Sequence, residues 1–445
     1  MSLDTLEHRY SYRNSSHLSD GASGTDGQVI LAPDRPFSFQ GQFANSGLFC
    51  DALLCLSDIV RSNFAYAAPG MLDPVVTCDP NGVRFEGFSG CCGVYVTANF
   101  MEPMFDNAQF EFGTTNVDFN DDFRNGLSLF RQKQSLSLLV RHDAVELIDE
   151  DSSYREKKVK LPLRWLRGFC EVQNILARVE HRITCSSREV RKFLQGLPRN
   201  AARQHPLWIV PSGKGLRAST RETDQAVPLV GTDRLRLMEK LLRSHDGTIS
   251  MGRIPDQATS SWFCEFGNLQ FGMLLSPGIY RGFSGEGQVL SDLADESWKN
   301  AIDRVRGVLN WHENLDSDSL AAKLKLPRNE ISSALTALAT RGVLGYDLYQ
   351  QRYFYRVMPF ESSLVESLQP RLIAARKIVQ QNRISGCDSN SDSERWIVQG
   401  SGVEHLVEVT QQSYKCSCIW YSKHKTTRGP CKHILAAMIC RGEEA

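Results

Sequence analysis

Four closely spaced residues near the C-terminus constrain the fold of this chain more than any other feature. Cys416 and Cys418 are followed, after a twelve-residue segment, by Cys431 and His433. Three thiolates and one imidazole suit tetrahedral Zn²⁺, and a set of four protein ligands leaves no position open for a catalytic water. The spacing therefore predicts one structural zinc ion held by these four residues. The alternative is a cluster of free thiols in a reducing compartment.

The residues around this cluster predict a small ββα module over 395–445. Two short strands are expected at 396–399 and 405–409, and a Gly-Pro turn at 429–430 precedes an apolar pattern with helical period. A module of this size has too little apolar surface to fold unaided. Zinc binding would supply the missing free energy, which is about 10–16 kcal/mol in small zinc fingers.

The C-x-C, variable gap, C-x-H arrangement resembles the SWIM zinc finger, and the Pro-Cys-Lys-His-Ile run at 430–434 is also typical of that family. This resemblance covers 395–445 and implies a module that binds DNA or a protein partner. More weakly, segments at 115–120 and 163–169 make the whole chain similar to bacterial SWIM proteins found beside MoxR-type AAA ATPases and von Willebrand factor A proteins. That similarity implies an adaptor in a multi-protein system, with one of those proteins as its partner.

Length, charge and hydropathy limit the remaining possibilities. A chain of 445 residues is too long for one ordinary core, so several domains are expected. Lys plus Arg and Asp plus Glu both total 51, so any nucleic-acid contact must come from a local basic patch. The sequence contains no apolar run of membrane-spanning length, no signal-like N-terminus and mostly scattered cysteines. We therefore expect a cytoplasmic protein in a reducing compartment, without a membrane partner.

The pattern of elements predicts an α+β multidomain protein with a β-rich N-terminal region, a winged-helix-like segment and a small C-terminal ββα zinc finger. The expected divisions are a disordered tail at 1–35, a mixed α/β region of uncertain fold at 36–290 with a possible division near 200, a winged-helix-like domain at 291–360, a helix and flexible linker at 361–394, and the SWIM-type finger at 395–445.

The winged-helix prediction rests on three helical segments followed by two strands that meet near Arg352. In a DNA-binding version, the third helix would present Arg328, Asn329, Ser332 and Ser333 to base edges or phosphates, and Arg352 at the hairpin tip would reach an adjacent groove. Protein docking is the competing interpretation, because this helix carries few basic side chains.

The segment between Cys418 and Cys431 is a second candidate contact with nucleic acid. It carries Trp420, Lys423, Lys425 and Arg428, a mixture of aromatic and basic side chains that can bind phosphates and bases. The competing interpretation is a solvated loop whose cations balance the negative charge of a three-thiolate zinc site.

The sequence predicts a non-enzymatic adaptor, but one alternative is a nucleic-acid-processing enzyme with the finger as its targeting module. The densest acidic cluster, with Asp118, Asp121 and Asp122, would be the catalytic candidate in the N-terminal region. It lacks the Gly and the terminal Glu of a calcium loop, and Asn and Asp at such a position more often cap a helix or form a solvated turn. The chain also contains no phosphate-binding P-loop motif.

Overall fold

The computed structural model describes residues 37–444, with gaps, and two short strands upstream. The gaps fall at 44, 65–73, 134, 151, 159–160, 198–206, 214, 256, 279–281, 288, 295–297, 314, 357, 359–368, 391–392, 401, 411–412 and 426–427. Within the expected tail at 1–35, β1 (Leu18–Ser19) and β2 (Gln28–Val29) form a small sheet with β12 (Leu161–Pro162), and the other residues of that tail lie outside the described part. None of the described helices is long and apolar enough to cross a membrane.

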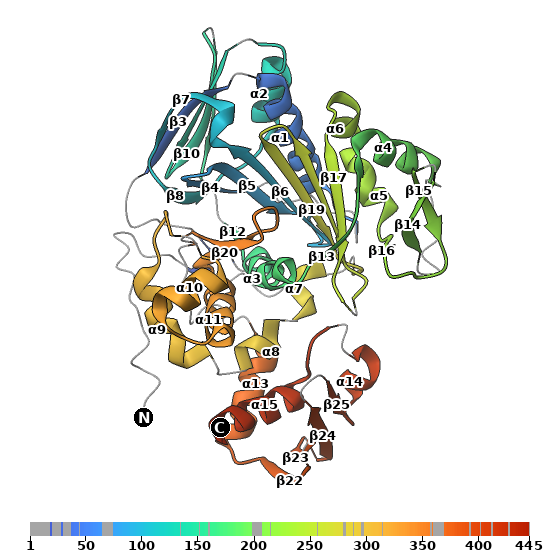
Figure 1. Ribbon diagram of the computed structural model, residues 1–445. Coiled ribbons are helices and arrows are strands. Elements are labelled where there is room, and N and C mark those ends of the chain that lie inside the picture. The colour runs from blue at the N-terminus through green and yellow to red at the C-terminus, as the bar shows by residue number, and fades with distance from the viewer. Residues whose placement is uncertain are drawn as a thin grey trace.

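An eight-stranded antiparallel sheet forms the centre of the molecule (Figure 1). Its strands, in spatial order, are β13 (Glu180–Ser186), β17 (Thr248–Arg253), β18 (Ser260–Phe266), β19 (Leu269–Leu275), β6 (Val94–Met101), β5 (Gly82–Phe88), β4 (Val75–Asp79) and β8 (Gly113–Asn116). Since β19 pairs with β6 along seven residues of each strand, the sheet crosses the division considered near residue 200. The β-rich region is thus held together by a pairing between distant segments.

A second sheet of five strands packs beside the first one. It contains β11 (Ser153–Lys157), β10 (Ala144–Ile148), β9 (Leu136–Arg141), β3 (Ser38–Phe43) and β7 (Phe105–Phe110). Helix α1 (Ser46–Arg61) contributes the apolar layer between the sheets, with nearly every side chain buried. The helix begins at Asn45, whose side chain accepts a hydrogen bond from the Leu48 amide, as an N-cap residue should.

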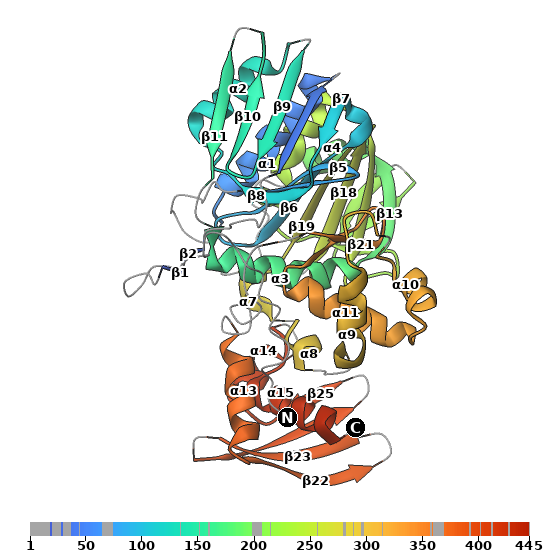
Figure 2. The same cartoon turned by 90° about the vertical axis from the view of Figure 1, so that its left-hand side faces the viewer.

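Shorter elements complete the β-rich region. They are the 3₁₀ helices η2 (Glu102–Met104) and η3 (Arg236–Met238), the helices α2 (Asp121–Phe130), α4 (Ser187–Gly196), α5 (Thr232–Leu235) and α6 (Glu239–Ser244), and a sheet of β14 (Trp208–Ser212), β15 (Gly215–Ser219) and β16 (Val227–Pro228). Helix α3 (Leu163–Ala177) lies between the large sheet and the C-terminal half (Figure 2). It packs against α7 (Gly282–Glu286) and α8 (Val289–Ala294), which follow β19 in the chain.

Three helices and a hairpin follow, in the order that the sequence pattern predicts. They are α9 (Lys299–Val308), α10 (Ser317–Leu324), α11 (Arg328–Thr340), β20 (Leu344–Asp347) and β21 (Arg352–Tyr355). These elements share a core of their own, which includes Ile302, Leu320, Leu335 and Leu344. An additional β-bridge joins Leu315, before α10, to Tyr353 in β21.

The β20–β21 hairpin is fixed to the large sheet by buried charged groups. Arg356, immediately after β21, forms an ion pair of 2.6 Å with Glu86 in β5, and both side chains are almost completely buried. The Tyr95 hydroxyl donates a second hydrogen bond of 2.5 Å to Glu86. Asp347 in β20 forms an ion pair with Arg84. The hairpin is therefore part of the body of the molecule.

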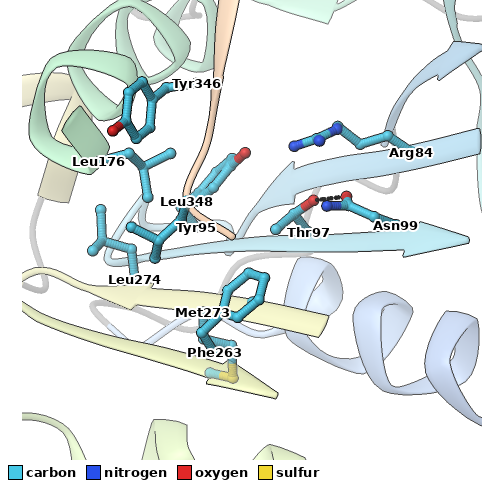
Figure 3. Close-up of a pocket in the computed structure, with 11 residues that line it drawn as sticks. Arg84, Tyr95, Thr97, Asn99, Leu176, Phe263, Met273, Leu274, Tyr346 and Leu348 are labelled. Carbon is cyan, nitrogen blue, oxygen red and sulfur yellow. Dashed lines mark hydrogen bonds between the residues drawn. The ribbon is translucent and has the colours of Figure 1, made fainter. Parts of the chain in front are cut away.

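A small pocket lies where this hairpin meets the sheet. Figure 3 shows Arg84, Thr97 and Asn99 among its polar lining, and Tyr346 and Leu348 of the hairpin region also contribute to it. The Thr97 hydroxyl donates a hydrogen bond of 2.7 Å to Asn99, and Arg84 is already paired with the hairpin carboxylate described above. Arg84 thus serves the packing of the hairpin, while Thr97 and Asn99 are paired within β6.

The C-terminal part is larger than the predicted ββα module. It comprises α13 (Pro370–Gln380), β22 (Ile384–Asn390), β23 (Ser393–Gln399), β24 (Glu404–Thr410), β25 (Tyr414–Cys416), α14 (Ile419–His424) and α15 (Lys432–Glu444). The strands form one antiparallel sheet in the order β22-β23-β24-β25.

This sheet corrects the prediction of a flexible linker within 361–394. Residues 384–390 form β22, which pairs with β23 through a register shift between Gly386 and Asp388. The Ser-, Asp- and Gly-rich composition suggested a linker, but an edge strand tolerates such residues because its backbone hydrogen bonds come from the neighbouring strand. Residues 359–368, 391 and 392 lie outside the described part of the chain.

Candidate metal centre

The four residues singled out by spacing converge in the structure. Cys416, Cys418, Cys431 and His433 are all buried, and their ligand atoms lie within 4.8 Å of one another. Nδ1 of His433 is 3.8 Å from the sulfur of Cys416 and 4.0 Å from that of Cys431. Ligands of a tetrahedral zinc site at ordinary bond lengths are separated by about 3.7 Å. The donor set and its dimensions fit one structural zinc ion.

Each ligand is placed by the end of a regular element. Cys416 ends β25, and Cys418 is the N-cap of α14, where its sulfur accepts a hydrogen bond of 3.4 Å from the Tyr421 amide. Cys431 and His433 lie at the start of α15. Gly429 has a φ of 67° in the turn before Cys431, a left-handed conformation that glycine adopts without strain. The β25–α14 connection and the turn before α15 therefore meet at the metal position.

The pKa shifts of the ligand thiols differ: the pKa of Cys431 is lowered, which favours the thiolate form that binds metal, whereas burial raises the pKa of Cys418. A hydrogen bond with Cys416 lowers the pKa of the Cys431 thiol to about 4, and His433 and the Ile434 amide act in the same direction. The same hydrogen bond, together with burial, raises the pKa of Cys416. Nε2 of His433 is buried, and the ring of His405 lies over His433 with 4.3 Å between ring centroids. The His433 ring thus lies against His405, while its Nδ1 faces the sulfurs of Cys416 and Cys431.

Comparison with protein families agrees with this geometry. Residues 407–442 match the family model of the SWIM zinc finger. The matched segment contains all four ligands, in the order and spacing that bring them together in space. This module is a SWIM zinc finger. The SWIM finger proper therefore begins within β24, and α13, β22 and β23 belong to the chain that precedes the match.

Other comparisons are more distant. No curated protein matches the chain. Among solved structures, Proliferating Cellular Nuclear Antigen from Entamoeba histolytica is similar with a TM-score of 0.36 and 14% sequence identity, covering 54% of this chain and 98% of that one. The PCNA2-PCNA3 complex from Sulfolobus tokodaii gives a TM-score of 0.39 and 9% identity, with 54% and 99% covered.

The residues predicted to read DNA from α11 are only partly accessible. Arg328 and Asn329 are exposed at the start of the helix, and Arg328 forms a surface ion pair of 2.9 Å with Asp318. Ser332 and Ser333 are half-buried, and the Ser332 hydroxyl donates a hydrogen bond of 3.1 Å to Ser317. The C-terminal half of α11 is buried, and the helix packs against α3 as well as α9 and α10. Of the four residues expected to read DNA from this helix, two are therefore exposed and two are half-buried.

The hairpin tip is also occupied by contacts within the chain. Arg352 is half-buried, and its Nε donates a hydrogen bond of 2.7 Å to Gln350. Tyr349 stacks on Phe263 of the large sheet, with ring centroids 5.8 Å apart. The hairpin tip thus contacts the large sheet through Tyr349, although Tyr349 and Gln351 are also exposed to solvent.

The predicted basic loop of the SWIM finger contains the short helix α14. Its Trp420 ring is half-buried between the Arg371 guanidinium, 4.8 Å away, and the His424 ring, 4.3 Å away. Lys423 and Lys425 are exposed. Of the four predicted contact residues in this segment, the two lysines present cations to solvent, while Trp420 is engaged and Arg428 is half-buried.

The acidic cluster in the N-terminal region caps a helix. Asn120 is the N-cap of α2 and accepts a hydrogen bond of 3.0 Å from the Phe123 amide, while Asp121 forms an ion pair of 2.6 Å with Arg61. Burial raises the pKa of Asp118. In the described part of the chain, the SWIM cluster is the group of His, Cys, Asp and Glu residues whose geometry could hold a metal ion. These contacts agree with the capping interpretation of the acidic residues.

One residue that contacts the turn before Cys431 was not indicated by the sequence pattern. Arg371 in α13 donates hydrogen bonds to backbone carbonyls next to Cys431, although it lies far outside the matched segment. An isolated arginine in a helix with several basic residues carries no local signal of such a role. Its contribution is visible only in three dimensions.

Proposed function

We propose that this chain is a non-enzymatic adaptor that binds nucleic acid through the α14 surface of its SWIM finger. The observation that carries the proposal is the exposure of Lys423 in α14 and of Lys425 at the C-cap of this helix, whose N-cap, Cys418, is itself a zinc ligand. Zinc thereby fixes the position of both cations. Phosphate contacts of this kind provide most of the affinity of proteins for nucleic acid, irrespective of sequence.

In this proposal, the α9–α11 bundle and its hairpin are a winged helix that serves for docking within the chain. The buried half of α11 and the Glu86–Arg356 ion pair support this role, because they use the surfaces that a DNA-binding winged helix leaves free. Arg328 and Asn329 would make at most auxiliary contacts with phosphates.

A protein partner is the second candidate, and an exposed apolar patch favours it. Leu406 is 51% exposed and Ile419 is 74% exposed, on either side of Ser417. Ser417 exchanges two hydrogen bonds of 3.1 Å with the Leu406 backbone, which places Leu406 beside the residue that separates Cys416 from Cys418, two positions before Ile419. Apolar patches on a protein surface often mark interaction sites. A MoxR-type AAA ATPase or a von Willebrand factor A protein would dock here.

Charge reversal on α14 tests the nucleic-acid proposal. Replacing Lys423 and Lys425 together with glutamate should weaken binding to DNA or RNA oligonucleotides at least about tenfold and lower the slope of log affinity against log salt by about two, because two phosphate contacts are lost. Binding is measured by fluorescence anisotropy between low and physiological salt. The matched control reverses Lys157 and Lys192, which are exposed lysines of the β-rich region, and should bind like the unchanged protein.

Two outcomes would count against this proposal. Equal loss of affinity in both double variants would indicate a bulk charge effect and not a site on α14. If the unchanged protein bound no oligonucleotide even at low salt, the apolar patch beside Ser417 would become the leading candidate surface.

A further inference from the structure

Arg371 joins two parts of the zinc site that are separate in sequence. Its Nη1 donates a hydrogen bond of 2.6 Å to the Arg428 carbonyl and one of 3.0 Å to the Pro430 carbonyl. Both carbonyls belong to the turn that delivers Cys431. Its guanidinium also lies 4.8 Å from the ring centroid of Trp420, in the helix that starts at Cys418. The Arg371 guanidinium thus contacts both the backbone that precedes the ligand Cys431 and the Trp420 side chain that follows the ligand Cys418.

The surroundings of Arg371 connect it to the body of the molecule. Burial lowers the pKa of its guanidinium, while the charge of Glu171 opposes that effect. Glu171 is a buried residue of α3, and its Oε2 accepts a hydrogen bond of 3.4 Å from the Val289 amide at the start of α8. Gly287 leaves the space that Arg371 needs, because a Cβ there would lie 2.0 Å from its Nη2. The arginine therefore lies at the junction of α3, α8, α13 and the finger.

Apolar side chains also connect α8, α13 and the SWIM finger. One hydrophobic cluster contains Val289 and Leu290 of α8, Leu372 of α13, and Ile434 and Leu435 of α15. Because Ile434 and Leu435 directly follow the ligand His433, the metal site and the packing on α8 share a helix. The finger has no apolar core separate from this cluster among the residues described.

We propose that Arg371 is a positioning residue for the zinc site, and that it couples metal binding to the packing of the finger on α8 and α13. Its two hydrogen bonds hold the turn before Cys431 in the conformation that metal binding requires. If zinc binding and packing of the finger on α8 and α13 are coupled, packing increases zinc affinity. Zinc binding then stabilises the packed finger by the same free energy. This inference is independent of what the finger binds.

Zinc affinity of the full chain tests the positioning role. Arg371→Ala should weaken zinc binding about 10- to 100-fold in competition with a chelator, since residues that orient metal ligands usually contribute that much. Arg371→Lys should lose less zinc affinity than Arg371→Ala, because an ammonium can still donate to one carbonyl. It should still bind zinc more weakly than the unchanged protein, because an ammonium cannot stack on Trp420 as a planar group. Lys377→Ala, an exposed position on the same helix, is the control and should bind zinc like the unchanged protein.

Two further readouts separate positioning from general damage. Co²⁺ bound to Arg371→Ala should keep the absorption of a site with three sulfurs and one nitrogen, because no ligand is removed. Chelation of the unchanged protein should speed amide hydrogen exchange in α8 and α13, which lie outside the matched segment.

Unchanged zinc affinity in a folded Arg371→Ala chain would overturn the positioning role. If that variant does not fold, Arg371→Lys decides in its place, and zinc affinity equal to that of the unchanged protein would overturn the role. If amide hydrogen exchange in α8 and α13 does not change when zinc is chelated, the coupling is overturned.

Discussion

Replacing Cys416 and Cys431 together with alanine is expected to abolish zinc binding and unfold the SWIM finger, while the eight-stranded sheet remains folded. Both thiols are buried at the point where β25 and α15 meet, so their loss removes the link between these elements. The lost binding free energy is about 10–16 kcal/mol by analogy with small zinc fingers, which is comparable to the entire stability of a typical domain.

The effect is measured by metal analysis and by amide hydrogen exchange along the chain. Exchange should become fast in β24, β25, α14 and α15 and stay slow in β5, β6 and β19. Cys440→Ala is the matched control, because this half-buried cysteine lies in α15 but outside the ligand cluster. Full zinc content in the double alanine variant would show that other residues bind the metal.

Glu86→Ala is expected to destabilise the chain by about 3–5 kcal/mol. Glu86 is fully buried, and its ion pair of 2.6 Å with the buried Arg356 fixes the segment after β21 to the large sheet. Removing the carboxylate leaves a guanidinium without its counter-charge in a low-dielectric interior, and such losses cost more than the intact pair contributes. The Tyr95 hydroxyl loses its acceptor at the same time.

Urea unfolding that reports on the large sheet measures this change. Glu222→Ala is the control, because the pair of 2.7 Å between Glu222 and Arg253 is at the surface and should contribute at most about 1 kcal/mol. Replacing Glu86 and Arg356 together with apolar residues should recover much of the loss. Similar small effects of Glu86→Ala and Glu222→Ala would show that the buried pair does not anchor the hairpin.

The parts of the site that sequence could predict are those defined by local patterns. The ligand types and the short spacings between Cys416 and Cys418, and between Cys431 and His433, are enough to indicate zinc without knowledge of the fold. The cap of α2 at Asn120 is likewise a local feature, because its hydrogen bond reaches only three residues along the chain.

Other features depend on contacts between distant segments. Arg84 and Glu86 lie in a strand with alternating sequence, which suggests a solvent-facing side, yet both are buried because Asp347 and Arg356 neutralise them from the other half of the chain. The role of Arg371 has the same origin, since the carbonyls it binds belong to another element. Local composition also gave a wrong prediction at β22, where polar residues expected to form a flexible linker form an edge strand.

The most direct test of the structural zinc site is X-ray absorption at the zinc edge of the purified full chain. We predict about one zinc per chain, bound by three sulfurs at about 2.3 Å and one nitrogen at about 2.0 Å, with no oxygen ligand. A water or carboxylate oxygen bound to the metal, or fewer than three sulfurs, would contradict a closed site formed by Cys416, Cys418, Cys431 and His433.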